Sequence, residues 1–162
     1  MQRRYATLAV LVLVLGSVLT TAASATPRTI TTHLTGAEEV PAVDTDATGQ
    51  VIFQLSADGS ELSYRLIVAN IHNVNQAHIH TAASGQNGPV VAWLYPSGPP
   101  AQLIEGRTQG VLATGVITSA DLVGQLAGGD LDDLIDLIDA GMAYVNVHTT
   151  PQNPAGEVRG QL

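Results

Sequence analysis

Two histidines separated by a single residue are the most informative chemical feature of the sequence. His78 and His80 flank Ile79 in a segment with the pattern of a β-strand. Side chains alternate between the two faces of a strand, so both imidazoles are expected on one face. Two imidazoles directed at one point suit copper or zinc. A third histidine, His148, ends another predicted strand, and the three converge if the two strand ends meet.

A structural role is the alternative for the same three histidines. Histidine also serves as a hydrogen-bonding residue at strand ends, here facing the loops 81–89 and 149–156. Both interpretations bring His78, His80 and His148 close together. We therefore expect their proximity in either case, with copper or zinc as the candidate metal.

Other catalytic arrangements have little support. The chain has no cysteine, and no G-x-S-x-G motif surrounds Ser84. Glu38 and Glu39 are adjacent, so in an extended segment they point to opposite faces and make a poor acid–base pair. The sequence assigns no catalytic residue and favours a non-enzymatic protein.

The elements that position these residues are mostly strands. Apolar residues alternate with polar ones on both sides of the turn 57–60, which predicts a β-hairpin of 51–55 and 62–68. Further predicted strands are 29–34, 77–81, 90–95, 110–117, 143–149 and 156–162, separated by segments rich in Gly, Pro, Asn and Ser. Eight short strands predict an all-β sandwich or barrel.

One short helical insertion, at about 119–140, interrupts the strand pattern. Thr118 or Ser119 can cap a first helix that ends at Gly128-Gly129. A second apolar row then follows helical spacing from Leu131 to Ile138. Asp132, Asp133, Asp136 and Asp139 occupy the opposite face, which we interpret as solvated rather than as a calcium site, because no calcium-binding loop motif is present.

The first 25 residues have the pattern of a signal peptide. Arg3 and Arg4 precede an apolar stretch over 8–19, and Ala23-Ser24-Ala25 offers a cleavage site. The stretch is shorter than the ~20 residues that span a bilayer. Cleavage would leave one domain, 26–162, in a secreted or periplasmic location, with no membrane span.

The mature chain is strongly acidic. Four arginines against fourteen carboxylates give residues 26–162 a formal net charge of −10, and there is no lysine. Such a surface repels phosphate backbones, which excludes nucleic acid as an expected partner. The expected partner is instead an unidentified extracellular or envelope component.

Several segments together resemble the CHRD domain, which is named after the developmental protein chordin and also occurs in bacterial secreted proteins. The matching segments follow the family's order and span 29–162; they are 34–41 with 45–49, 77–80, 87–91, 143–149 and 156–162.

The resemblance implies an immunoglobulin-like, superoxide-dismutase-like Greek-key β-sandwich. Within it, His78-Ile79-His80 is similar to a pair of copper ligands of copper–zinc superoxide dismutase, and His148 is similar to a third. The histidine that bridges copper and zinc, the zinc loop and the disulfide have no counterpart, and the spacing of Arg159 differs from that of the dismutase's substrate-steering arginine. A mononuclear three-histidine site is the most that these residues imply.

Two functions of different classes follow. The first is a non-enzymatic extracytoplasmic binding or structural domain. The second is a copper-binding protein that uses His78, His80 and His148, with redox chemistry related to superoxide as its possible use. Carbohydrate adhesion through Trp93 and Tyr95 is a weaker third.

Overall fold

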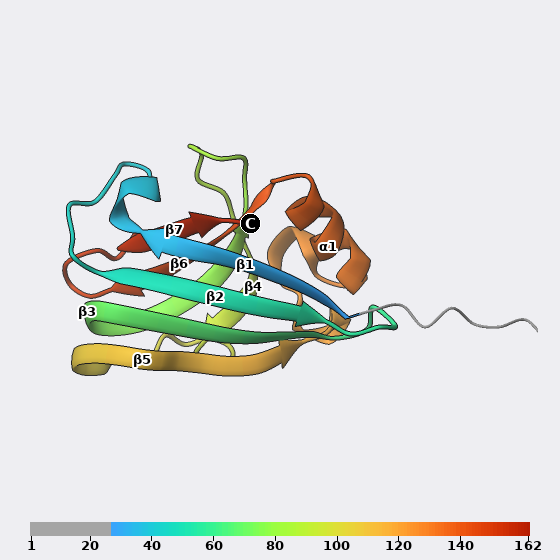
Figure 1. Cartoon of the computed structure of the whole chain (residues 1–162), viewed down its shortest axis with the longest axis horizontal. Helices are drawn as coiled ribbons and strands as arrows, with labels where there is room; N and C mark the ends of the chain where they lie inside the picture. Colours follow the sequence, from blue (N-terminus) through green and yellow to red (C-terminus); the bar gives the residue numbers. More distant parts are fainter. Residues whose placement is uncertain (1–26) are drawn as a thin grey trace, which may run out of the picture.

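Strands dominate the chain because apolar and polar residues alternate along most of its length. The computed structural model describes residues 27–162. Its strands are β1 (Arg28–Thr35), β2 (Thr48–Leu55), β3 (Leu62–Thr81), β4 (Val90–Tyr95), β5 (Ile104–Ile117), β6 (Ala143–Thr149) and β7 (Val158–Gln161) (Figure 1). One α-helix is present in this part of the chain, α1 (Leu131–Asp139), with short 3-10 turns at Gly36–Glu38, Ser119–Asp121 and Gly124–Leu126. The expected all-β class is confirmed.

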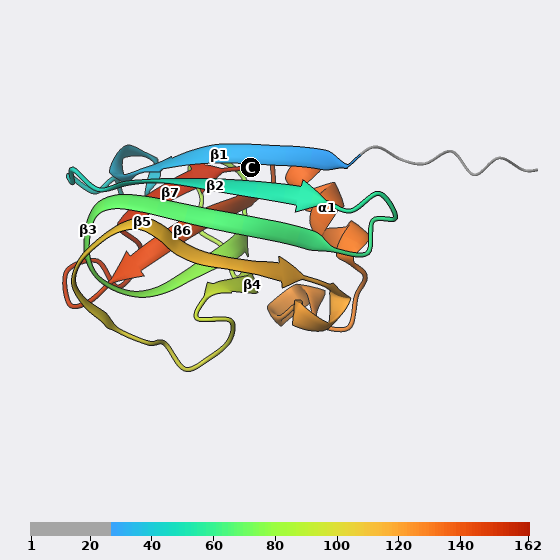
Figure 2. The same cartoon turned by 60° about the horizontal axis from the view of Figure 1, so that its bottom comes forward.

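The sheet closes on itself. Its strand order is β2-β1-β7-β6-β3-β4, and β2 also pairs with β3, so five strands form a closed ring. The pairs within this sheet are antiparallel. β4 and β5 extend the sheet from the remaining edge of β3, and β5 follows its outer side (Figure 2).

The long strand β3 belongs to both halves of the molecule. Its first part pairs with β2 and β5, and its last part pairs with β6 and β4. The expectation of separate strands at 62–68 and 77–81 is therefore wrong, and seven strands replace the eight expected. The polar segment between them stays extended because register shifts absorb the bend, and Asn70 and Asn73 take positive φ angles of 56° and 54°. Asparagine tolerates this left-handed conformation better than most residues.

The interior of the ring is apolar. Phe53, Leu66, Ile79 and Val145 are fully buried in one hydrophobic cluster with residues from β1, β4, β7 and α1. Burial of this apolar surface is the main stabilising contribution to a domain without disulfides.

The helical segment only partly follows the sequence pattern. The expected helix from Ser119 to Gly128 is replaced by two 3-10 turns, although the Asp121 carboxylate does accept hydrogen bonds from the amide and hydroxyl of Thr118. The first 3-10 turn ends at Asp121 and does not continue as an α-helix, because the next residues bond to β4. The Val123 amide donates a hydrogen bond to the Val91 carbonyl at 2.8 Å.

α1 buries the four apolar residues expected from its spacing and exposes the four aspartates on the other face. It lies near the start of β1 (Figure 1), where Arg28 forms an ion pair with Asp139.

No helix among the described residues is long and apolar enough to cross a membrane. The predicted signal peptide, residues 1–25, lies outside the described residues.

Candidate metal centre

The sheet formed by the end of β3, β6 and β7 is buried on both faces. Every residue of β6 is buried, whereas a strand with one solvated face alternates between buried and exposed positions. Ala143, Val145 and Val147 of this strand belong to the hydrophobic cluster. The opposite face is polar and buried beneath loops. It carries His78, His80, Tyr144, Asn146, His148 and Arg159, with the partly buried Gln161 at its edge.

The three histidines singled out from the sequence meet on this polar face. Asn146 pairs with His78 across β3 and β6, which places His148 beside the His78–His80 pair. Nδ1 of His78 lies 3.1 Å from Nε2 of His148. One ring nitrogen from each of the three lies within 4.8 Å of the others, and their exposed fractions are 3, 8 and 5% for His78, His80 and His148. In the described part of the chain, no other group of three His, Asp or Glu side chains is so arranged.

Two of the histidines are oriented by loop carbonyls. Nδ1 of His80 lies 2.9 Å from the Gly88 oxygen, and Nδ1 of His148 lies 3.0 Å from the Pro154 oxygen. A carbonyl oxygen only accepts, so each Nδ1 carries the hydrogen and each Nε2 presents a lone pair. Hydrogen bonds of this kind to the loops are what a purely structural role of the histidines predicts. They also leave Nε2 of His80 and Nε2 of His148 available as metal ligands.

Burial keeps the histidines neutral. It lowers the pKa of His78 to about 3, with smaller contributions from His148 and His80. It lowers the pKa of His148 to about 4 and also lowers that of His80, in each case against an opposing loop hydrogen bond. Neutral imidazole is the form that binds metal ions.

Aromatic rings pack around the histidines. Trp93 is half-buried and lies edge-on to His78, with ring centroids 4.3 Å apart, so one side of its ring packs against the site. Tyr144 stacks on His80 at 4.9 Å and an interplanar angle of 11°. Such packing fixes the orientations of the His78 and His80 rings and places aromatic carbon atoms against them.

Arg159 closes the polar face on the β7 side. Its guanidinium lies 3.5 Å from the centre of the Tyr144 ring and donates to the Gln86 carbonyl at 2.8 Å and to the Asn87 side chain at 3.2 Å. Arg159 is 1% exposed. It therefore holds the loop between β3 and β4 in place. A group that steers a substrate would face solvent, and Arg159 does not.

Glu39 is the residue of this site that the sequence did not reveal. Glu38 lies on the surface and accepts a hydrogen bond from the Gln161 amide, whereas Glu39 is buried. Burial raises the pKa of Glu39 to about 7, partly offset by Arg159 and Asn146. The extended segment expected here is instead a 3-10 turn, which ends at Glu38 and is followed by Glu39, and nothing in the local pattern placed Glu39 beside β6.

A glycine makes room for this carboxyl group. Gly156 has a φ of +133°, and a Cβ there would collide with Glu39 Oε1 and with Asn146 Nδ2. Gly156 is thus the local signal that two polar side chains approach the backbone at this point.

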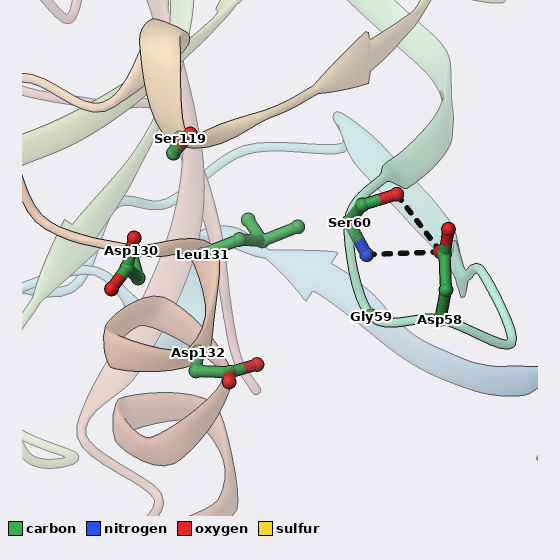
Figure 3. A pocket seen from close by; sticks show the side chains of 7 residues that line it. All are labelled: Asp58, Gly59, Ser60, Ser119, Asp130, Leu131 and Asp132. Carbon is green, nitrogen blue, oxygen red and sulfur yellow. Dashed lines mark hydrogen bonds between the residues drawn. The ribbon is translucent and has the colours of Figure 1, made fainter.

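The remaining histidines and the acidic residues lie elsewhere. His33 on β1 and His72 on β3 are exposed and outside the cluster. A pocket of about 270 Å³ lies between the β2–β3 turn and the start of α1, lined in part by Asp58, Asp130 and Asp132 (Figure 3). The Asp58 carboxylate turns back to its own loop, where it accepts hydrogen bonds from Ser56 and Ser60, which argues against a shared ion.

The arrangement of these segments agrees with the comparison with known families. The family model described as CHRD domain matches residues 30–162. The chain belongs to the CHRD-domain family. The resemblance recognised in the sequence is thereby confirmed over residues 30–162. Among curated proteins and solved structures, the comparisons found no significant match to this CHRD domain.

Proposed function

We propose that this CHRD domain binds one transition-metal ion, copper, through His78, His80 and His148. The observation that carries the proposal is the convergence of three buried rings whose nitrogens lie within 4.8 Å of one another. Nε2 of His80 has no hydrogen-bond partner among the described residues. Buried polar atoms without a partner are costly, and a bound ion removes that cost.

The residues fit such an ion in geometry and in protonation state. Nitrogens bound to one ion at about 2.0–2.1 Å lie roughly 3–4 Å from each other. The 3.1 Å between His78 Nδ1 and His148 Nε2 falls in this range. The loop carbonyls of Gly88 and Pro154 supply the outer hydrogen bonds that usually orient metal-binding histidines.

The ligand set favours copper among the common ions. Imidazole binds copper, zinc, nickel and iron, and affinity along the divalent series is highest for copper. No thiolate or carboxylate is within the histidine cluster to favour another ion. Bound copper supplies one-electron chemistry, while the chain's own residues hold it, exclude bulk water and fix the ring tautomers.

The wider role that we propose is non-enzymatic binding outside the cytoplasm. The acidic charge and the predicted signal peptide support export. We also propose that the kinship to copper–zinc superoxide dismutase extends to the Greek-key fold, supported by the position of the three histidines on β3 and β6. Sequencing the N-terminus of the exported protein tests cleavage after Ala25, and any other mature N-terminus rejects that cleavage site.

Copper loading of the purified domain tests the metal site. The protein is equilibrated with copper, separated from free ion and measured by elemental analysis. About one equivalent is expected for a single three-ligand site, and it should be lost in the double variant His78→Ala/His80→Ala. The matched control is His33→Ala/His72→Ala, which also removes two histidines but leaves the cluster intact.

The control separates this site from surface binding. Equal loss of copper in both double variants would show adventitious binding by exposed histidines and reject the proposal. Absence of copper in the loaded wild-type protein would leave the histidines with the structural role of anchoring their loops.

A further inference from the structure

The polar site is larger than the three histidines. Four buried side-chain atoms on this face have no hydrogen-bond partner among the described residues: Nε2 of His78, Nε2 of His80, Oδ1 of Asn146 and Oε1 of Glu39. All four residues are more than nine-tenths buried. Asn146 pairs with His78 across the sheet, and Glu39 meets Asn146 at Gly156. Buried polar atoms without a partner indicate an absent ligand, so we include Asn146 and its neighbour Glu39 in the site.

Asn146 connects the histidines to Glu39. Its amide nitrogen lies 3.4 Å from the Ala155 carbonyl and beside Oε1 of Glu39. Burial raises the pKa of Glu39, and the contact with Asn146 acts in the opposite direction, as expected when an N–H faces a carboxylate. The Asn146 side chain lies on the same face as that of His78, because the two residues are paired across β3 and β6.

The groups that face this place are all acceptors. Nδ1 of His80 gives its hydrogen to Gly88, so its Nε2 offers a lone pair. The amide oxygen of Asn146 only accepts, and Glu39, whose pKa is raised to about 7 by burial, only accepts in its ionised form. Three acceptors repel one another unless the group between them carries positive charge and hydrogens. A metal ion at the three histidines would meet the lone pair of His80, and a water molecule bound to that ion would have hydrogens to donate to Asn146 and to ionised Glu39.

Arg159 is the buried cation near these acceptor groups, and the hydrogen bonds recorded for it go to other groups. Arg159 uses its N–H groups on the Gln86 carbonyl and on the side chains of Asn87 and Gln161. Its flat face lies against Tyr144. Arg159 therefore compensates the charge of Glu39, while the N–H groups of both its terminal nitrogens are engaged by the β3–β4 loop and by Gln161.

We propose that Glu39 and Asn146 make the histidine site selective for a neutral hydrogen-bond donor, water, as the exogenous ligand beside the ion, and that Glu39 excludes small anions. This inference rests on the proposed function, since it requires copper at the three histidines. It assigns Glu39 as the residue that determines specificity and Asn146 as its partner.

Azide binding to the copper(II)-loaded domain tests the inference, with the charge-transfer absorption of the azide complex as readout. Wild-type protein should bind azide weakly. Glu39→Gln replaces an acceptor oxygen by an N–H donor and removes a negative charge, so azide affinity should rise about tenfold or more. The control is Glu157→Gln, because both oxygens of that buried carboxylate already accept from Thr45 and Thr149; its azide affinity should equal that of the wild type.

The outcomes are distinct. Equal azide affinity in wild type and Glu39→Gln, or no azide complex in any of the three proteins, overturns the inference. A second measurement needs no variant: electron spin echo modulation of the wild-type copper(II) protein in D₂O should show deuterons of a bound water, and their absence also overturns it. Copper content is measured before azide is added, so failure to bind copper identifies failure of the proposed function instead.

Discussion

Nδ1 of His78 lies 3.1 Å from Nε2 of His148, although the two residues are 70 positions apart in the sequence. β3 and β6 create this contact, because their antiparallel pairing places Asn146 opposite His78 and Gln76 opposite His148. Each side chain is then held by its surroundings, His78 by Trp93 and His148 by the Pro154 carbonyl. A rigid pair of strands thus positions the proposed ligands, and the loops orient them.

The first prediction concerns the loop that orients His80. A Cβ at Gly88 would collide with the Thr81 carbonyl, so Gly88→Ala must displace the carbonyl that fixes the His80 ring. Loss of such an outer contact typically lowers metal affinity roughly 10- to 100-fold. Competition titration of copper against a chelator measures the change. Gly98→Ala, where a Cβ meets nothing within 4 Å, serves as the control and should keep wild-type affinity.

The second prediction is loss of stability of the metal-free protein in acid. In the unfolded chain His148 titrates near 6.5, whereas in the folded protein its pKa is about 4. As pH falls below 6.5, the unfolded state binds the proton first, so the free energy of unfolding decreases until pH passes about 4.

Urea denaturation from pH 7 to pH 3.5 measures this loss, and His148→Gln, which does not titrate, should show a shallower decline. Glu39 opposes the effect between its ordinary pKa of 4.5 and its folded pKa of about 7, since its protonated form is favoured in the folded state. The decline should therefore be steepest below pH 4.5. Identical profiles for wild type and His148→Gln would contradict the assignment.

The third prediction concerns Arg159. Arg159→Met keeps much of the side-chain volume but removes the charge opposite Glu39 and the hydrogen bonds to Gln86 and Asn87. Breaking a buried pair by removing one partner costs roughly 3–5 kcal/mol of folding stability.

Urea denaturation at pH 8, where Glu39 is ionised, should show this loss for Arg159→Met. The loss should be smaller at pH 5, where Glu39 is protonated in the folded protein. A loss independent of pH would mean that packing against Tyr144, not charge, dominates.

The fourth prediction separates stability from metal binding. Leu134 in α1 is fully buried, so Leu134→Ala should destabilise the domain by about 2–5 kcal/mol. Its copper affinity should remain that of the wild type, because α1 belongs to the apolar core and contributes no residue to the polar face. Thermal unfolding and copper titration of the same variant check both parts. A parallel loss of copper affinity would show that the core and the polar face are coupled.

The sequence by itself determined the all-β class, the CHRD family, the amphipathic helix α1 and the face shared by His78 and His80. These are local features: a period of two residues fixes which side chains share a face, and the apolar spacing from Leu131 to Ile138 fixes a helix. The proximity of His148 to His78 and His80 could be predicted because a metal site and a hydrogen-bonding role both require it.

Tertiary structure decided what depends on pairing between distant segments. It joined two expected strands into β3 and shortened the first expected helix to 3-10 turns, because pairing with neighbours outweighed local propensity. It also buried Glu39 and Arg159 beside the histidines and turned Arg159 away from solvent. No local pattern encodes such burial, since whether a charged side chain is exposed depends on which loops cover it once the sheet has closed.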